Sequence, residues 1–123
     1  TLVVSHVRAW EAPTARALLA FARKGGTVVL DALSGRKDFD SGAHRPWPGH
    51  LAGPLGLAVT DLETGLGTFP LVAHQHAAGA AATYRTAVRC EAAWTPVSAL
   101  RFADDASPAV MQRRWGRGRF VYV

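Results

Sequence analysis

The sequence predicts an α/β domain that begins with parallel strands and ends in a β-hairpin. Two apolar segments rich in β-branched residues, at 2–4 and 27–30, enclose a segment with helical periodicity. Such a strand–helix–strand unit pairs its strands in parallel, with a right-handed crossover. Near the other end of the chain, Gly116-Arg117-Gly118 separates two strand-like segments, as in a tight hairpin turn.

The strand–helix–strand unit is marked at each of its boundaries. Leu2-Val3-Val4 is a short strand-like run, and Thr27-Val28-Val29-Leu30 is apolar on both faces, as in a strand covered from both sides. Pro13 suits the first turn of the helix, and Gly25-Gly26 supplies the left-handed residue that ends it. An apolar stripe at helical spacing lies between these limits, formed by Ala15, Leu18, Leu19 and Ala22.

The middle of the chain has a different composition. Residues 31–70 are rich in glycine and proline, which predicts a long irregular region with a short helical turn near 49–55. From about residue 71 the pattern favours β structure. The candidate strands span 71–76, 83–91, 97–103, 108–115 and 119–123.

The composition fits a single domain over residues 1–123. The chain has 14 Lys+Arg, 9 Asp+Glu, a formal charge of +5 and 49% hydrophobic residues, which excludes wholesale disorder. No apolar run approaches the ~20 residues of a membrane helix, so we expect no membrane partner. Cys90 is the only cysteine, which excludes an internal disulfide and a multi-cysteine zinc site.

Most of the basic excess belongs to the C-terminal hairpin. Four of the five net charges come from arginines within seven residues, namely Arg113, Arg114, Arg117 and Arg119. With Trp115, Phe120 and Tyr122 beside them, these arginines could bind nucleic acid through charge and stacking. We favour ion pairs within the chain or with a neighbouring chain, because guanidinium groups pair well with carboxylates. We therefore expect no nucleic acid partner.

No motif makes a convincing catalytic or metal site. Cys90 lacks the flanking glycines of a nucleophile elbow. An amidotransferase-like hydrolase is therefore the least favoured functional hypothesis. His74-x-His76 could place two imidazoles on one strand face, but a zinc site needs further ligands. Turn hydrogen bonds or salt bridges explain the carboxylate pair Asp38-x-Asp40. We predict no catalytic residue, no metal and no cofactor.

Two tryptophans stand out as candidate contacts with a partner or a sugar. Trp10 follows the first strand, at the carboxyl end where open α/β sheets place their ligand crevices. Trp47 lies in the loop 45–48, and aromatic residues in such loops serve as interface anchors. The candidate interface or sugar-proximal residues are Trp10, Asp38, Trp47, Arg113, Arg114, Arg117 and Arg119.

Several short motifs follow one another along nearly the whole chain. They are Thr1-Leu2-Val3-Val4, Arg23-Lys24-Gly25-Gly26-Thr27-Val28-Val29-Leu30, Ser34-Gly35-Arg36-Lys37-Asp38, Pro48-Gly49-His50-Leu51, Leu55-Gly56-Leu57-Ala58-Val59, Ser107-Pro108-Ala109-Val110 and Trp115-Gly116-Arg117-Gly118-Arg119-Phe120-Val121-Tyr122-Val123. In this order and spacing they resemble the trimerisation domain of family 42 β-galactosidases, which ends in Gly-Lys-Gly-Arg and an aromatic-rich strand.

The resemblance implies a fold and a role. The fold is a flavodoxin-like, class I glutamine-amidotransferase-like domain of three layers with a parallel sheet. The role is assembly without catalysis, in which three protomers meet and the domain helps to wall a neighbouring active site. In the family, a preceding (β/α)₈ barrel cleaves terminal β-galactosides with two glutamates. The implied partners are therefore further copies of the parent protein, as a homotrimer, and the parent's barrel.

The resemblance also implies that this chain is a piece of a longer glycoside hydrolase. The family domain begins with a further strand and helix before the equivalent of Leu2-Val3-Val4, so we expect an N-terminally truncated domain. The opening residues contain no signal-peptide pattern, and we expect a cytoplasmic location.

Overall fold

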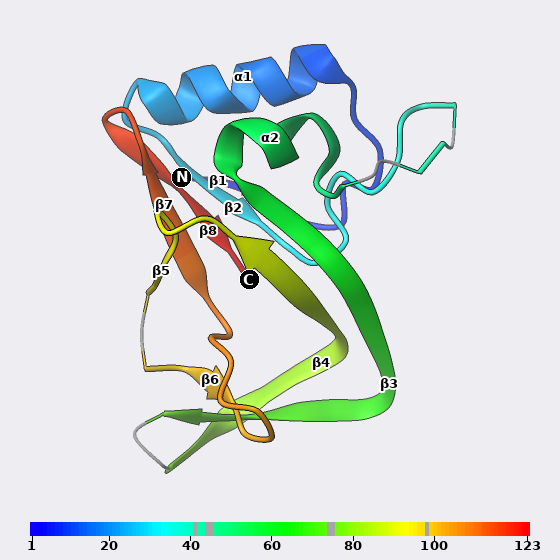
Figure 1. Ribbon diagram of the computed structural model, residues 1–123, viewed down its shortest axis with the longest axis vertical. Helices are drawn as coiled ribbons and strands as arrows, with labels where there is room; N and C mark the ends of the chain where they lie inside the picture. Colours follow the sequence, from blue (N-terminus) through cyan, green and yellow to red (C-terminus); the bar gives the residue numbers. More distant parts are fainter. Residues whose placement is uncertain (41, 44–45, 74–75, 98) are drawn as a thin grey trace.

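A mixed five-stranded sheet organises the molecule, with strand order β1-β2-β8-β7-β5 (Figure 1). The computed structural model describes residues 1–40, 42–43, 46–73, 76–97 and 99–123. The strands of this sheet are β1 (Leu2–Val4), β2 (Thr27–Leu30), β5 (Thr95–Pro96), β7 (Met111–Trp115) and β8 (Gly118–Tyr122). Strands β1, β2 and β8 run parallel, whereas β7 and β5 are antiparallel to their neighbours. The α/β class predicted from the sequence is confirmed.

Helix α1 (Ala12–Arg23) connects β1 to β2 as the sequence predicts. Its apolar stripe faces the sheet, and Ala15, Leu18 and Ala22 are buried there. The helix ends before Gly25, whose φ of 115° lies in the left-handed region that favours glycine. The strand–helix–strand unit and its parallel pairing are therefore confirmed.

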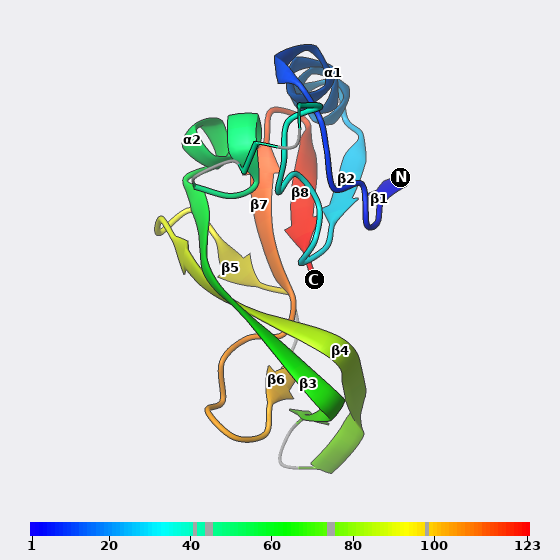
Figure 2. The same ribbon diagram turned by 90° about the vertical axis from the view of Figure 1, so that its right-hand side faces the viewer.

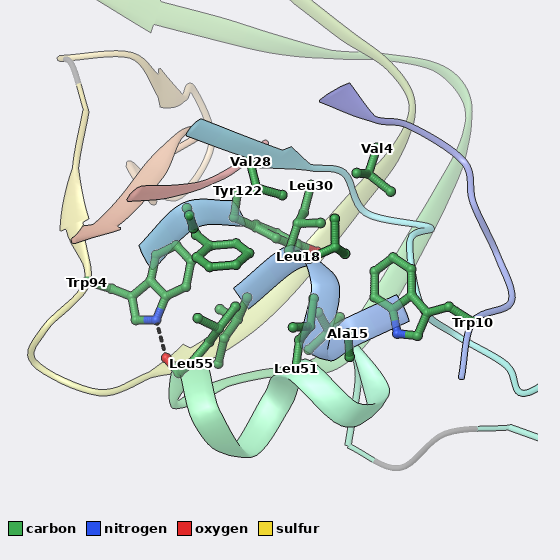
Figure 3. Close-up of a cluster of buried hydrophobic side chains, with 14 residues drawn as sticks. Val4, Trp10, Ala15, Leu18, Val28, Leu30, Leu51, Leu55, Trp94 and Tyr122 are labelled. Atoms are coloured by element: carbon green, nitrogen blue, oxygen red, sulfur yellow. Dashed lines mark hydrogen bonds between the residues drawn. The ribbon is translucent and has the colours of Figure 1, made fainter. Parts of the chain in front are cut away.

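The hydrophobic core lies on one face of the main sheet. Val28, Leu30, Phe120 and Tyr122 point to this face from neighbouring positions of the parallel strands β2 and β8. The side chains of α1 cover them, together with residues of a short helical segment over 49–55 (Figure 3). That segment consists of η1 (Gly49–Leu51) and α2 (Ala52–Leu55), as the sequence predicts.

The expected flavodoxin-like, amidotransferase-like arrangement of three layers is not confirmed. Among the described residues, α1, η1 and α2 contribute to one core on the same sheet face. Alternate positions of β2 and β8 place Thr27, Val29, Arg119 and Val121 on the opposite face, where they are half-buried or exposed. The main sheet is mixed because β7 and β5 pair in the antiparallel direction. The described part of the chain is rich in strands because β3 and β4 form a hairpin instead of another strand–helix crossover.

A long antiparallel hairpin replaces the last part, from Leu57 to Pro70, of the irregular region that we expected over 31–70. It consists of β3 (Leu57–Ala73) and β4 (His76–Cys90), and it extends away from the main sheet with the short strand β6 (Arg101–Phe102) (Figures 1 and 2). The glycines and proline of 65–70 suggested a loop, but here they lie within a strand whose register shifts twice between Val59 and Thr68. Bulges of this kind accommodate residues that disfavour regular strands.

The other strand predictions hold in part. The candidate at 71–76 covers only the end of β3 and the first residue of β4, with 74–75 outside the described residues. The candidate at 83–91 matches the second half of β4 up to Cys90, and β6 retains two residues of the candidate at 97–103. Strands β7 and β8 with their turn at 116–117 confirm the C-terminal hairpin. No helix in the described part of the chain is long and apolar enough to span a membrane.

Candidate interaction surfaces

Close backbone contacts hold the C-terminal hairpin, formed by β7 and β8, against the end of α1. The amide N–H groups of Arg117 and Arg119 donate hydrogen bonds to the carbonyl oxygens of Arg23 and Gly26, each at 3.1 Å. A Cβ atom at position 118 would overlap the carbonyl oxygens of Gly26 and Ala22. The glycine at 118 therefore allows the hairpin to approach the helix, and this approach fixes the direction of the neighbouring arginines.

Three of the four predicted arginines share one surface, which we call the arginine surface: Arg114, Arg117 and Arg119. All three side chains are exposed, and together with Thr27 and Gln112 they line a cavity of about 640 Å³. Arg119 Nε lies 3.4 Å from Thr27 Oγ1. No carboxylate of the described residues lines this cavity. The surface is therefore strongly basic and open to an anionic partner.

Arg113 lies apart from the arginine surface. It precedes Arg114 on the same strand, so the two side chains point to opposite faces of the sheet. Its Nη1 donates to the carbonyl oxygen of Leu55 and lies 3.5 Å from Glu91 Oε2. Its guanidinium carbon is also 5.8 Å from the centroid of Trp115. These contacts tie the hairpin to the end of α2, which is a structural role.

The two candidate tryptophans occupy very different environments. Trp10 is only 1% exposed and belongs to the core, where a Cβ atom at Gly35 would overlap its ring. Trp47 is half-buried, and the guanidinium carbon of Arg36 lies 4.4 Å from its ring centroid. With Lys37 and Asp61 it lines an open cavity of about 710 Å³. Trp47 thus contributes to a surface, whereas Trp10 packs inside the domain.

Asp38 closes its own loop. Its Oδ1 accepts a hydrogen bond of 2.6 Å from the amide of Gly42, and its own amide donates to the carbonyl oxygen of the same glycine at 2.9 Å. This reciprocal pair is a local turn contact that explains the residue without catalysis.

A second charged cluster, which we call the acidic surface, is formed by Asp61, Glu63, Asp104 and Asp105. All four residues are exposed, and Glu63, Asp104 and Asp105 contact Arg85, whose side chain is only 12% exposed. Arg85 Nη1 lies 2.5 Å from Asp104 Oδ2 and 4.0 Å from Glu63 Oε2, and Nη2 contacts Asp105. The amide of Ser107 donates to Asp105 and, with Arg85, lowers the pKa of that carboxyl group. Sequence reasoning missed this cluster, although the adjacent pair Asp104-Asp105 was a visible signal.

Asp31 forms a polar cluster at the carboxyl ends of β1 and β2. Its carboxylate accepts hydrogen bonds from the hydroxyl groups of Ser34 (2.7 Å) and Ser5 (2.8 Å). It also accepts from the backbone amides of His6 (2.8 Å) and Leu33 (3.1 Å). Burial raises the pKa of this carboxyl group, but the four hydrogen bonds outweigh burial, so its pKa lies below the ordinary 3.8.

Replacing Asp31 by Asn should destabilise the domain by about 1–2 kcal/mol at neutral pH, because a carboxamide cannot accept all four donors. A carboxyl group with a lowered pKa stabilises the folded state above its ordinary pKa of 3.8, and this contribution is lost as the pH falls through the folded-state value. The stability gap between the two proteins should therefore close below about pH 3.8. Urea unfolding at several pH values measures the gap. The exposed Asp40→Asn is the control, and a pH-independent gap would contradict the assignment.

The other candidates for catalysis or metal binding gain no support from the geometry. Cys90 is half-buried with its Sγ 3.9 Å from Met111 Sδ, and burial raises the pKa of its thiol, which disfavours the reactive thiolate. His74 lies outside the described residues, as does the side chain of His76. Within the described residues, no group of three or more His, Cys, Asp or Glu side chains could hold a metal ion.

Comparison with solved structures places this fold among β-galactosidases. The structure of a cold-adapted β-galactosidase from Rahnella sp. R3 matches with a TM-score of 0.84 and 18% identity, and that from Bacillus circulans sp. alkalophilus with 0.84 and 17%. Each match covers 98% of this chain and 19% of the other. Gan42B, a GH42 β-galactosidase from G. stearothermophilus, matches with 0.83 and 22%, over 99% of this chain and 18% of its own.

The chain thus spans about a fifth of the length of the solved proteins that it matches. At these identities the structural matches show the shared fold alone. A search of curated proteins found no match. The sequence model of the β-galactosidase trimerisation domain, however, matches residues 1–123, which is the whole chain. The chain therefore belongs to the β-galactosidase trimerisation domain family.

Proposed function

We propose that this chain is a non-catalytic accessory domain of a β-galactosidase-like glycoside hydrolase. In this role it holds protomers of the parent protein together, as a homotrimer, and helps to wall a neighbouring active site. The observation that carries the proposal is the match of the trimerisation-domain model over residues 1–123.

The chemistry of the described side chains supports a role without catalysis. The residues most suited to nucleophilic or acid–base work are held by local structure, since the Cys90 thiol has a raised pKa and Asp38 closes its own loop. Oligomerisation needs none of these groups. It needs exposed surfaces of complementary chemistry, and the arginine and acidic surfaces are of this kind.

Nucleic acid binding receives less support from the hairpin. Single-stranded nucleic acids bind to exposed aromatic rings placed beside basic groups. Phe120 is 0% exposed and Tyr122 is 5% exposed, so neither ring can stack on a base. The third ring, Trp115, is half-buried, with the guanidinium groups of Arg23 and Arg113 about equally distant from its centroid. The hairpin offers charge without a stacking platform.

We further propose that the chain is one part of a longer protein, as its short coverage of the matched structures suggests. The test is to sequence the coding region on both sides of this chain. The proposal predicts an upstream (β/α)₈ barrel that contains two catalytic glutamates. A neighbouring region without such a barrel would contradict the assignment to a glycoside hydrolase.

A further inference from the structure

We infer that the arginine surface of one copy of this chain binds the acidic surface of a second copy, head to tail. This inference rests on the proposed function and specifies which two surfaces meet. Assembly of three identical subunits in a ring requires two different, complementary surfaces on each subunit, because each interface joins unlike patches. The described part of the chain carries two such surfaces, one basic and one acidic.

The arginine surface is not neutralised within the described residues. None of its three guanidinium groups lies within 4.0 Å of a carboxylate there, in contrast to Arg85 and Arg113. Arg114 and Arg119 are moreover direct partners across the β7–β8 ladder. Like charges at opposed positions destabilise a strand pair. An anionic partner would remove this repulsion, which makes binding favourable at this end of the molecule.

The acidic surface has the opposite imbalance. Three carboxylates, those of Glu63, Asp104 and Asp105, contact the single guanidinium of Arg85, and the exposed Asp61 lies near them on β3, so the cluster keeps a net negative charge. Asp61, Glu63 and Asp105 line a cavity of about 380 Å³ beside it. The side chains of Glu63 and Asp104 are 62% and 65% exposed, which leaves their outer oxygen atoms free to accept further hydrogen bonds.

The arginine surface lies at one end of the long axis of the molecule, whereas the acidic surface runs from Asp61 on β3, beside the Trp47 cavity, to the loop after β6 toward the other end. The turn between β7 and β8 lies beside the end of α1, whereas the loop after β6 lies at the far end, as both views show (Figures 1 and 2). Three elongated copies that each join one end to the unlike end of the next can close as the sides of a triangle. Because the contacts are ionic and partly exposed, their strength should fall with salt.

The arginine surface lacks the free backbone amides that many phosphate sites use. Phosphate sites commonly use a nest of free backbone amides. Here the amides of Arg117 and Arg119 are already bonded to carbonyl oxygens of Arg23 and Gly26. The contacts available are the planar guanidinium forks, which match carboxylate geometry in pairs.

Charge reversal combined with sedimentation velocity tests the inference on the 123-residue chain. At low salt, Arg114→Glu/Arg117→Glu should weaken self-association about tenfold or more, and so should Asp61→Lys/Glu63→Lys. The chain with all four changes should regain association, because both surfaces have exchanged sign. The control Arg8→Glu/Arg16→Glu alters exposed arginines elsewhere by the same charge and should leave association within about twofold of the wild type. Circular dichroism melts verify that each variant is folded.

The outcomes separate this inference from the proposed function. If the wild-type chain associates but Arg114→Glu/Arg117→Glu associates as the control does, the inference is wrong and the proposed function stands. If the wild-type chain is a folded monomer at every concentration and salt, the inference is wrong, whereas the proposed function is decided by the molar mass of the full-length protein. A closed two-fold dimer would also overturn the head-to-tail contact. The inference would also be overturned if charge reversal left association unchanged and the wild-type chain instead bound a single-stranded oligonucleotide. That binding would weaken with salt and would be lost in Arg114→Glu/Arg117→Glu.

Discussion

Gly118→Ala is expected to lower the free energy of unfolding by about 3 kcal/mol, since the new methyl group has no space. It would overlap the carbonyl oxygens of Gly26 and Ala22 and lie 2.8 Å from the carbonyl carbon of Gly25. All three neighbours are backbone atoms, so relief requires the hairpin to move away from α1. That movement would break the hydrogen bonds that Arg117 and Arg119 donate to the end of the helix.

Gly53→Ala is the matched control for this substitution. Gly53 lies in α2, and a Cβ atom there would meet nothing within 4 Å. Alanine favours helix over glycine by about 1 kcal/mol, so this variant should be as stable as the wild type or slightly more stable. Chemical denaturation of the two variants compares them directly. Equal stabilities would show that the hairpin does not depend on its close approach to the helix.

Phe120→Ala is the second substitution with a large expected effect, at about 3–5 kcal/mol. The ring is fully buried at the centre of the main sheet, opposite Val28, and packs edge-on against Trp115 with centroids 6.5 Å apart. Its removal leaves a cavity between the sheet and the helices. A loss of this size can unfold a small domain completely. Phe120→Leu, which keeps most of the volume, should cost about 1.5 kcal/mol or less and keep the measurement possible.

Phe39→Ala provides the control, because the Phe39 side chain is 69% exposed. Urea unfolding should give the same free energy for this variant as for the wild type, within about 0.5 kcal/mol. A small effect of Phe120→Ala, similar to that of Phe39→Ala, would contradict the position of the core between β8 and the helices.

The sequence predicted those parts of the fold that local signals determine. The stripe from Ala15 to Ala22 and the glycine at 25 sufficed for α1, and Gly116 with the strands around it sufficed for the hairpin. Most of strand β3 was missed because its middle contains glycines and a proline, and because it pairs mainly with the neighbouring β4 instead of a buried sheet. Burial on one face therefore does not impose a regular alternation of apolar and polar side chains along this strand.

The interaction surfaces were predicted in part. The run of arginines at 113–119 is visible in the sequence, and strand alternation alone could have separated Arg113 from Arg114. The acidic surface depends on contacts between β3, β4 and the loop after β6, which are distant in sequence. The burial of Trp10 likewise depends on the loop that contains Gly35, which no local pattern around Trp10 reveals.

The most direct test of the assembly role is the molar mass in solution of the full-length protein that carries this chain. Multi-angle light scattering should be measured with and without residues 1–123. The assembly role predicts a trimer for the intact protein and a monomer after the deletion, with circular dichroism confirming that the remainder is folded. A trimer that survives the deletion, or an intact protein that is monomeric, would contradict it.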